Sequence, residues 1–573
     1  MTKFNWQQIK TLLFTKGLLT VLLLSPGAAS ATSNNSVPEI NNTNYAIPSD
    51  AYFVSPDGQD TNTGRTVNSP WSVAKAIAAA PSGATIIFRG GVYRDVQVNI
   101  RKNLTLQAYP HEKPWIKGSV VVNDWVKDGN IWRKDGWEHS FPFKGQPESL
   151  DPNYPLAGHR DMVFINNVTQ KQVGSKSQVV PGTFYVDAAN KKLYIGSNPA
   201  GKTVESTAKE FAFTTSNSAE NTVIRGLGIT HYADNAINIR RPNVTLENNT
   251  LIWNGLNGVL LTDTDAVLRG NILSYNGRQG VAGVYAHRML LENNVLSHNN
   301  VENFSKQWGA AGIKTIWTDG LVWRGNLVEH NNAIGLWIDE STTNSTVVNN
   351  VVRKNASIGI MYEIAHKAII ASNVVYENAP AGIMVLNASS ARIYNNTLVR
   401  NHANLLIKET PRNNTKTKEI ADGITWITRN TVVKNNILWN SNGPTFFAPS
   451  CELREQSRQM IPVTDYNAYY RPAVNEPQNF VVWGLSGGQC FNTFRTLASF
   501  VSATGLESNG LEVTNSNDPF FVNAEANDFR LKSGSPAIKR GEALPADIAH
   551  AMGVPAGKVV DLGALQSQVS IAH

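Results

Sequence analysis

Short apolar stretches recur along this chain from residue 221 onward, each broken by asparagine and glycine at a fixed place. The interval is roughly 23 residues, which is the length of one coil of a solenoid. The stretches have the length of strands and lack a helical period, so they predict a single-stranded parallel β-helix. The asparagines that mark the repeat are Asn249, Asn271, Asn294, Asn326, Asn350, Asn373, Asn396 and Asn436.

Two further positions complete the repeat. A second asparagine lies five residues after each of the first seven asparagines just named, from Asn254 to Asn401. A glycine lies nine residues after most of those same seven, as Gly258 does after Asn249. We expect the asparagines to satisfy one another's amide groups from coil to coil. We expect the glycines to permit sharp corners.

The glycine of each coil separates the inward from the outward positions, because side chains alternate along a strand. Residues one and three positions after it are mostly aliphatic and are predicted to point inward. Residues two and four positions after the glycine point outward. The first outward column reads Leu260, Ala282, Lys314, Trp337, Met361 and Met384, and the second reads Thr262, Val284, Ile316, Asp339, Glu363 and Leu386. Phasing one coil on Gly283 instead of Gly280 would bring His287 into the second outward column.

Two carboxylates therefore fall on adjacent coils, at Asp339 and Glu363. Adjacent strands are ~4.8 Å apart, and like charges directly opposite each other destabilise a sheet. Two carboxyls this close cannot both ionise readily, so one of them stays protonated beside an ionised partner. That combination is typical of glycoside cleavage, in which retaining enzymes need carboxyls ~5–5.5 Å apart. We predict that Asp339 and Glu363 are catalytic.

Other residues near the pair fit a sugar site. Extra residues before Gly312 bring Trp308 over the groove, and Trp337 and Met361 flank the carboxylates. Aromatic faces stack on sugar rings, while Lys314 can bond hydroxyls or a substrate carboxylate. The excursion from Lys408 to Arg429 is expected to form another wall. The candidate substrate-binding residues are Trp337, Lys314, Trp308, Glu340, His287 and Met361.

The rest of the chain divides by composition. Residues 1–31 have the lysines, apolar run and small residues of a secretory signal peptide, and residues 32–48 resemble a disordered linker. Residues 49–108 are predicted to form an N-terminal cap, with a helix near residues 71–80, and the first coils. Residues 109–212, rich in tryptophan and turns, are predicted to form an inserted β-sandwich, although irregular long coils are the alternative. The main β-helix follows over 213–445, and degenerate turns with a capping extension occupy 446–573.

Charge and cysteine content narrow the class. The formal charge of +7 falls to +4 without the signal peptide, and no basic block is present, so nucleic acid is not an expected partner. No stretch after the signal peptide approaches the ~20 apolar residues of a membrane span. In a secreted or periplasmic protein, Cys451 and Cys490 are predicted to pair as a disulfide. They are too few for a zinc site, so no metal or cofactor is expected.

The asparagine ladder and the opening Val54-Ser55-Pro56-Asp57-Gly58 resemble the pectate-lyase-like superfamily of right-handed parallel β-helices. The Asp and Glu on successive coils, together with an insertion, are similar to glycoside hydrolase family 120, the β-xylosidases. That resemblance implies an Asp nucleophile and a Glu acid/base, which here match Asp339 and Glu363. It implies a retaining hydrolase acting on an oligosaccharide or polysaccharide.

Two other functions remain open from the sequence. A polysaccharide lyase would use Lys314 as the base, with Asp339 and Glu363 as calcium ligands beside a uronate. A non-catalytic carbohydrate-binding or surface solenoid would use neither carboxylate for turnover. Chelator-sensitive release of unsaturated products marks the lyase, and retention of function by Asp339→Asn marks the solenoid.

Overall fold

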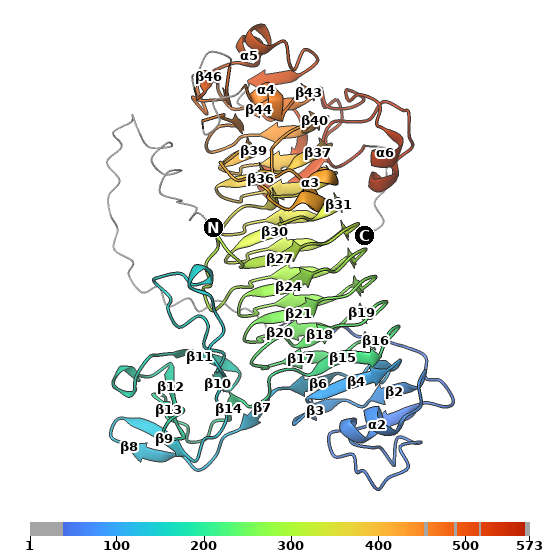
Figure 1. Cartoon of the computed structure of the whole chain (residues 1–573), viewed down its shortest axis with the longest axis vertical. Helices are drawn as coiled ribbons and strands as arrows, with labels where there is room; N and C mark the ends of the chain where they lie inside the picture. Colours follow the sequence, from blue (N-terminus) through green and yellow to red (C-terminus); the bar gives the residue numbers. More distant parts are fainter. Residues whose placement is uncertain (1–37, 452–455, 486–489, 515–516, 568–573) are drawn as a thin grey trace. The chain divides into compact units, whose positions relative to one another are not determined.

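The computed structural model describes residues 38–451, 456–485, 490–514 and 517–567. Within the compact unit Glu39–His573 the chain winds through three sheets of thirteen strands each, which we call sheets A, B and C. Each coil of the main stack gives one strand to sheet C, then one to sheet A and one to sheet B (Figure 1). The predicted parallel β-helix is confirmed. The predicted signal peptide lies outside the described residues.

Sheet C carries the outward columns. Its strands pair in parallel until the last pair, β45 with β46, which is antiparallel. The strands are β4 (Val98–Lys102), β15 (Phe213–Ser218), β18 (Ile237–Ile239), β21 (Asn257–Leu261), β24 (Gln279–Val284), β27 (Ala311–Ile316), β30 (Ile334–Ile338), β33 (Ile360–Glu363), β36 (Ala381–Leu386), β39 (Ala403–Lys408), β42 (Phe446–Ala448), β45 (Val481–Trp483) and β46 (Asn492–Phe494).

Sheets A and B complete each coil. Sheet A contains β1 (Tyr52–Val54), β2 (Thr85–Phe88), β5 (Thr105–Ala108), β16 (Val223–Arg225), β19 (Thr245–Glu247), β22 (Val267–Arg269), β25 (Leu290–Glu292), β28 (Val322–Arg324), β31 (Thr343–Val348), β34 (His366–Ala371), β37 (Ser389–Tyr394), β40 (Val432–Lys434) and β43 (Val463–Asp465). Sheet B contains β3 (Gly91–Tyr93), β6 (Pro114–Lys117), β17 (Gly228–Thr230), β20 (Thr250–Ile252), β23 (Ile272–Ser274), β26 (Val295–Ser297), β29 (Leu327–Glu329), β32 (Val351–Arg353), β35 (Val374–Tyr376), β38 (Thr397–Val399), β41 (Ile437–Trp439), β44 (Ala468–Arg471) and β47 (Leu511–Thr514).

The predicted inward column is the core. Its members Val259, Val281, Ile313, Leu336, Ile360 and Ile383 are fully buried and pair with one another in register. Val281 pairs with Ile313, so phasing on Gly280 is correct. His287 therefore lies beyond the end of β24 and outside the second outward column.

The asparagine ladder forms as expected. The Asn350 side chain donates to Asn373 Oδ1 at 3.0 Å and accepts from Asn326 Nδ2 at 3.0 Å, and the same pairing repeats along the stack. One member was not predicted: Asn436 donates to Asn467, which in turn donates to the carboxylate of Glu507.

The role expected of the repeat glycines is wrong. Gly335 is not among the left-handed positions, which at the corners are occupied by residues such as Ser341 and Asn349. Instead, a Cβ on Gly335 would lie 2.6 Å from the carbonyl oxygen of Gly359 on the next coil. Glycine is needed here because the coils approach closely, not because the chain turns.

The N-terminal part of the unit matches the prediction of a cap. Helix α2 (Val73–Ala79) begins at Ser72, whose hydroxyl accepts from the backbone N–H of Lys75 at 3.2 Å. Residues 38–48 have no helix or strand, as expected of a linker, but they are not disordered. Ile40 is 2% exposed and the Tyr45 hydroxyl accepts from Asn248, so this stretch packs along the coils.

The insertion is narrower than the predicted 109–212, because β6 already belongs to sheet B. It is one curled eight-stranded sheet whose two halves enclose a core that includes Val163, Phe184 and Leu193. Within it, β12 (Thr183–Asp187) and β13 (Lys192–Ile195) form an antiparallel hairpin. Two short 3₁₀ helices, η1 (Pro147–Ser149) and η2 (Lys176–Gln178), lie in its loops. The strands are β7 (Ser119–Val121), β8 (Val126–Asp128), β9 (Ile131–Asp135), β10 (Val163–Ile165), β11 (Val168–Gln172), β12 (Thr183–Asp187), β13 (Lys192–Ile195) and β14 (Val204–Thr207).

The C-terminal residues fold back and cover the outer faces of sheets A and B. Apolar side chains on the outer face of sheet B, including Tyr376 and Trp439, pack against the hairpin of β48 (Phe521–Asn523) and β49 (Asp528–Leu531), which encloses η3 (Ala524–Ala526). Helix α6 (Ala546–Met552) covers Tyr394 and its neighbours on sheet A. These outer faces are apolar, and the tail removes them from water.

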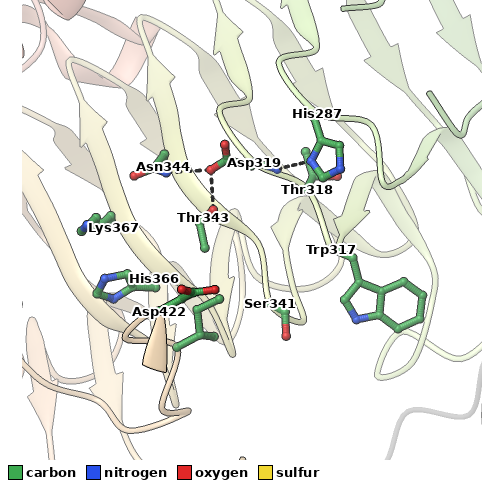
Figure 2. A pocket seen from close by; sticks show the side chains of 11 residues that line it. His287, Trp317, Thr318, Asp319, Ser341, Thr343, Asn344, His366, Lys367 and Asp422 are labelled. Carbon is green, nitrogen blue, oxygen red and sulfur yellow. Dashed lines mark hydrogen bonds between the residues drawn. The ribbon is translucent and has the colours of Figure 1, made fainter. Parts of the chain in front are cut away.

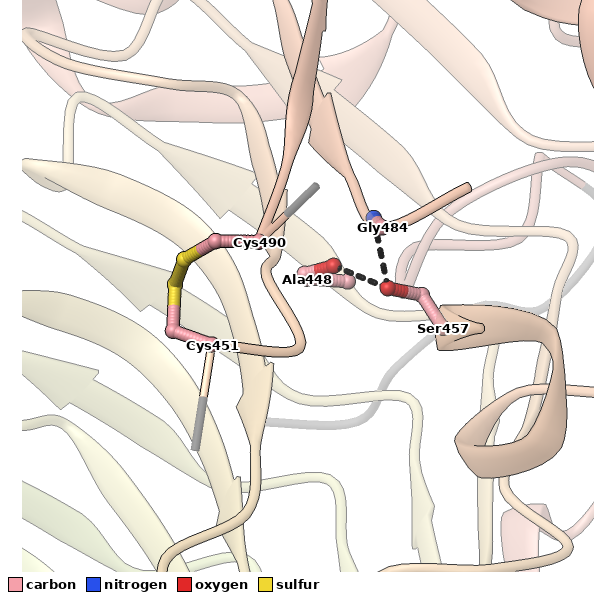
Figure 3. The surroundings of a disulfide bond; sticks show 5 residues. All are labelled: Ala448, Cys451, Ser457, Gly484 and Cys490. Carbon is pink, nitrogen blue, oxygen red and sulfur yellow. Dashed lines mark hydrogen bonds between the residues drawn. A yellow bond between two sulfur atoms is a disulfide. The ribbon is translucent and has the colours of Figure 1, made fainter. Parts of the chain in front are cut away.

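The predicted disulfide between Cys451 and Cys490 is present (Figure 3). Beside it, the Ser457 hydroxyl at the start of α4 (Ser457–Met460) donates to the carbonyl oxygen of Ala448 and accepts from the N–H of Gly484. Helix α5 (Leu497–Thr504) follows with a Thr496 cap. Within the described ranges, none of the helices is long and apolar enough to cross a bilayer.

Candidate active site

Asp339 and Glu363 stand side by side on neighbouring coils. Trp337 pairs with Met361 in register, and each carboxylate comes two residues after its member of that pair. Both point away from the core column, yet Asp339 is only 8% exposed and Glu363 only 5%. The predicted juxtaposition is therefore present, but the two carboxylates are largely buried and do not lie on an open face.

The Asp339 carboxylate is held by two donors. Lys314, one coil earlier, places Nζ 2.7 Å from Oδ2, and the backbone N–H of Glu340 donates to Oδ1 at 2.7 Å. A charge-assisted bond to one oxygen and a backbone amide bond to the other fix the orientation of the carboxylate.

The Glu363 carboxyl has different surroundings. Burial and, second, the negative charge of Asp339 raise the pKa of Glu363 to about 7, although Arg412 and Lys314 oppose the rise. The Trp337 indole N–H donates to Oε2 at 3.1 Å, and Arg412 Nη1 lies 2.5 Å from Oε1. Near neutral pH this group can both give and take a proton.

Arg412 was not identified from the sequence. It lies in the excursion between β39 and β40, which we call the wall segment (409–429) and which includes the short helix α3 (Thr417–Ala421). Asn387 anchors the segment by donating to the carbonyl oxygens of Thr410 and Trp426. The sequence feature that could have pointed to Arg412 is a cation within the long excursion that follows the carboxylate coils. The excursion does reach the carboxylate pair, as the predicted wall should.

The other predicted binding residues differ in placement. Lys314 Nζ lies 3.5 Å from the centre of the Trp337 ring and donates to the carbonyl oxygen of Trp308 at 2.7 Å. Trp337 is 2% exposed and Met361 is 7% exposed, so neither offers a free face, whereas the Trp308 side chain is 44% exposed at the rim. Glu340 lies 3.2 Å from Lys416 of the wall segment.

His287 lies at the neighbouring corner between sheets C and A. Its Nδ1 accepts from the backbone N–H of Asp319 at 3.0 Å. Together with Trp317, Asp319 and residues of the wall segment, it lines a pocket of about 330 Å³ (Figure 2). His287 therefore lies beside the carboxylate coils, and it lines a pocket whose lining includes neither Asp339 nor Glu363.

The donor set bears on metal binding. Among the described residues, no group of three or more His, Cys, Asp or Glu side chains is arranged to hold a metal ion. Asp339 is instead ion-paired with Lys314, and Glu363 with Arg412.

Comparison with known proteins places the fold. Residues 228–398 match the family model described as a right handed beta helix region, so the handedness is as predicted. None of the curated proteins matches the chain. Among solved structures, the complex of XylC with xylose has a TM-score of 0.56 at 15% identity, over 82% of this chain and 86% of that one. This likeness shows the fold that the two share.

Two other structures are more distant. One described as a glycoside hydrolase has a TM-score of 0.46 at 13% identity, over 63% of this chain and 94% of its own. The pectate lyase Pel9A has a TM-score of 0.44 at 11% identity, over 90% and 96%. The protein is a right-handed parallel β-helix.

Proposed function

We propose that this protein is a secreted or periplasmic carbohydrate-active enzyme, a retaining glycoside hydrolase in which Asp339 is the nucleophile and Glu363 is the acid/base. The observation that carries the proposal is the asymmetry of the pair. One carboxylate, Asp339, is ion-paired with Lys314, whereas burial and the neighbouring negative charge raise the pKa of the other, Glu363, to about 7. Retaining hydrolysis needs both roles at one strand spacing.

The reaction has two balanced steps. An Asp339 oxygen attacks the anomeric carbon, the glycosidic C–O bond breaks, and Glu363 gives its proton to the leaving oxygen. Glu363, now ionised, takes a proton from water, whose oxygen attacks the same carbon and releases Asp339. Trp337 and Arg412 position Glu363, while the ion pair with Lys314 positions Asp339.

The placement of Lys314 favours hydrolysis over β-elimination. A lyase base must be able to take a proton from the sugar carbon, whereas Lys314 is ion-paired with Asp339 and lies over the Trp337 ring. A lyase acting on a uronate polymer is therefore the second candidate.

The first test is a screen of aryl glycosides and acidic polysaccharides, with and without chelator. Xylosides come first because the XylC complex contains xylose. We expect release of the aryl group, no unsaturated product absorbing in the ultraviolet, and a product with the anomeric configuration of the substrate by NMR. An inverted product or a chelator-sensitive unsaturated product would overturn the proposal.

The second test separates the two carboxylates. Asp339→Asn should abolish turnover of every substrate. Glu363→Gln should lose activity on substrates with poor leaving groups. It should still form the glycosyl-enzyme from dinitrophenyl glycosides, seen as a burst of dinitrophenol, and azide should restore its turnover. The matched control is Glu292→Gln, an ion-paired carboxylate on sheet A, which should behave as the wild type. Full activity of Asp339→Asn would refute its role as the nucleophile.

A further inference from the structure

The pocket beside the catalytic coils is built from two layers. Turns of the stack supply Trp317, Asp319 and Asn344, and the wall segment supplies Asp422 and Ile424 (Figure 2). Its volume of about 330 Å³ lies at the lower end of the range for small-molecule sites, where a sugar ring fits. The catalytic mechanism above uses none of these side chains.

The pocket lies next to the nucleophile. Ser341 lines it and is two residues after Asp339, so the backbone at the two points is separated by at most ~7 Å. Trp317 donates its backbone N–H to the carbonyl oxygen of Glu340 at 2.7 Å, which fixes the pocket edge to the catalytic coil. One glycosidic linkage can span this separation.

The polar groups of the pocket are already oriented. Asp319 Oδ1 accepts from Thr343 Oγ1 at 2.5 Å and from Asn344 Nδ2 at 2.6 Å. Because His287 Nδ1 accepts a backbone N–H, the proton of its neutral ring is on Nε2, which is a donor. A carboxylate has about four acceptor sites, so Asp319 can still accept from sugar hydroxyls.

An aromatic surface completes the arrangement. The Trp317 ring stacks on Tyr285 with centroids 5.1 Å apart, and Tyr285 is 54% exposed. Lys416 of the wall segment lies 5.8 Å from the same Trp317 ring and also pairs with Glu340. An apolar ring face beside fixed hydroxyl partners is the usual composition of a sugar site.

The charges of the pocket select the kind of sugar. Two carboxylates, Asp319 and Asp422, face it, against one lysine, Lys367, and the rings of His287 and His366. Burial raises the pKa of Asp319, but hydrogen bonds from Thr343 and Asn344 and the positive charge of nearby groups outweigh it, so the pKa is lowered. An anionic uronate would meet a like charge here.

We propose that this corner pocket is a second sugar subsite, which binds a neutral sugar ring bonded to the one held at Asp339 and Glu363. Trp317 stacks on the ring, and Asp319 and His287 bond its hydroxyls. This proposal rests on the proposed function, because it extends the same substrate beyond the bond that is cleaved. It makes the enzyme prefer oligosaccharides over single-sugar glycosides.

The test compares kcat/KM for an oligosaccharide and for an aryl glycoside of one sugar. Trp317→Ala and Asp319→Ala should each lower the oligosaccharide value by roughly tenfold to a hundredfold and leave the aryl glycoside within about threefold. Tyr275→Ala, an aromatic stacked on the sheet B side, is the matched control and should change neither. Equal losses on both substrates, or no loss on either, would overturn the subsite.

A binding measurement separates this result from failure of the proposed function. Calorimetric titration of Asp339→Asn with the neutral oligosaccharide should show binding, and adding Trp317→Ala to the same chain should weaken it roughly tenfold or more. If the oligosaccharide binds in this Trp317-dependent way while the wild type hydrolyses nothing, hydrolysis fails and the subsite stands. If hydrolysis occurs but binding is indifferent to Trp317, the subsite fails alone.

Discussion

If Glu363 is the proposed acid, Arg412 should set the alkaline limit of activity. Its Nη1 lies 2.5 Å from Glu363 Oε1, and a guanidinium so placed lowers the pKa of a carboxyl by about one to three pH units. The Arg412 side chain is 27% exposed, so solvent screening puts its contribution at the lower end, about one pH unit or about 1.4 kcal/mol. Arg412→Met should therefore raise the pKa of Glu363 from about 7 to about 8.

The consequence for activity has a definite sign. In the proposed mechanism Glu363 must be protonated to release the leaving group, so kcat/KM should be lost as pH rises through its pKa. In Arg412→Met this alkaline limb should move upward by about one pH unit, even if the maximal rate falls. The assay is kcat/KM on a cleaved aryl glycoside from about pH 4 to about pH 10.

The matched control is Lys416→Met, a cation of the same wall segment that pairs with Glu340 and Glu419. Its alkaline limb should stay within about 0.3 pH units of the wild type, since Lys416 is not among the groups that act on the pKa of Glu363. A limb that stays in place or moves downward in Arg412→Met would refute the assignment of Glu363 as the acid.

Three stability predictions complete the set. Burial raises the pKa of Glu507 to about 7 from an unfolded value near 4.5, so the folded state loses stability as pH rises between these two values. Glu507→Gln should remove about 2–3 kcal/mol of this pH dependence, measured by thermal melts at low and high pH, and an unchanged dependence of stability on pH would contradict the raised pKa. Asn350→Ala leaves buried partners unpaired above and below and should lower the free energy of unfolding in urea by about 3–5 kcal/mol; a loss below about 1 kcal/mol would show that the ladder is not stabilising. Gly335→Ala should destabilise by about 2 kcal/mol because its Cβ meets the next coil, whereas Gly309→Ala, with open space around it, should be neutral; equal effects would exclude the steric reason.

The repeat could be predicted from the sequence because each coil obeys the same local constraints. Alternation fixed which side chains face the core, and it placed Asp339 beside Glu363 once Gly335 and Gly359 were aligned. The same logic predicted the asparagine ladder. The reason assigned to the glycines was wrong because sequence spacing does not distinguish a corner from a close approach between coils.

What could not be predicted depends on segments that leave the repeat. Arg412 reaches Glu363 from 49 residues away, and the position of a long excursion has no period from which to infer it. The covering of sheets A and B by the C-terminal tail is equally non-local. The sequence placed His287 near the carboxylates, but only the strand register showed that it belongs to the corner pocket.

The amide side chains of the ladder all point the same way. Each gives its N–H to the coil that follows, from Asn249 through Asn467, so their dipoles add along the direction of winding. Glu507 places a carboxylate at the electropositive end of this row. Because hydrogen bonds in such a chain polarise one another, a break in the middle separates two long runs, whereas a break at either end removes only one member. The stack therefore has an electrical polarity, and its tolerance of damage is greatest at its two ends.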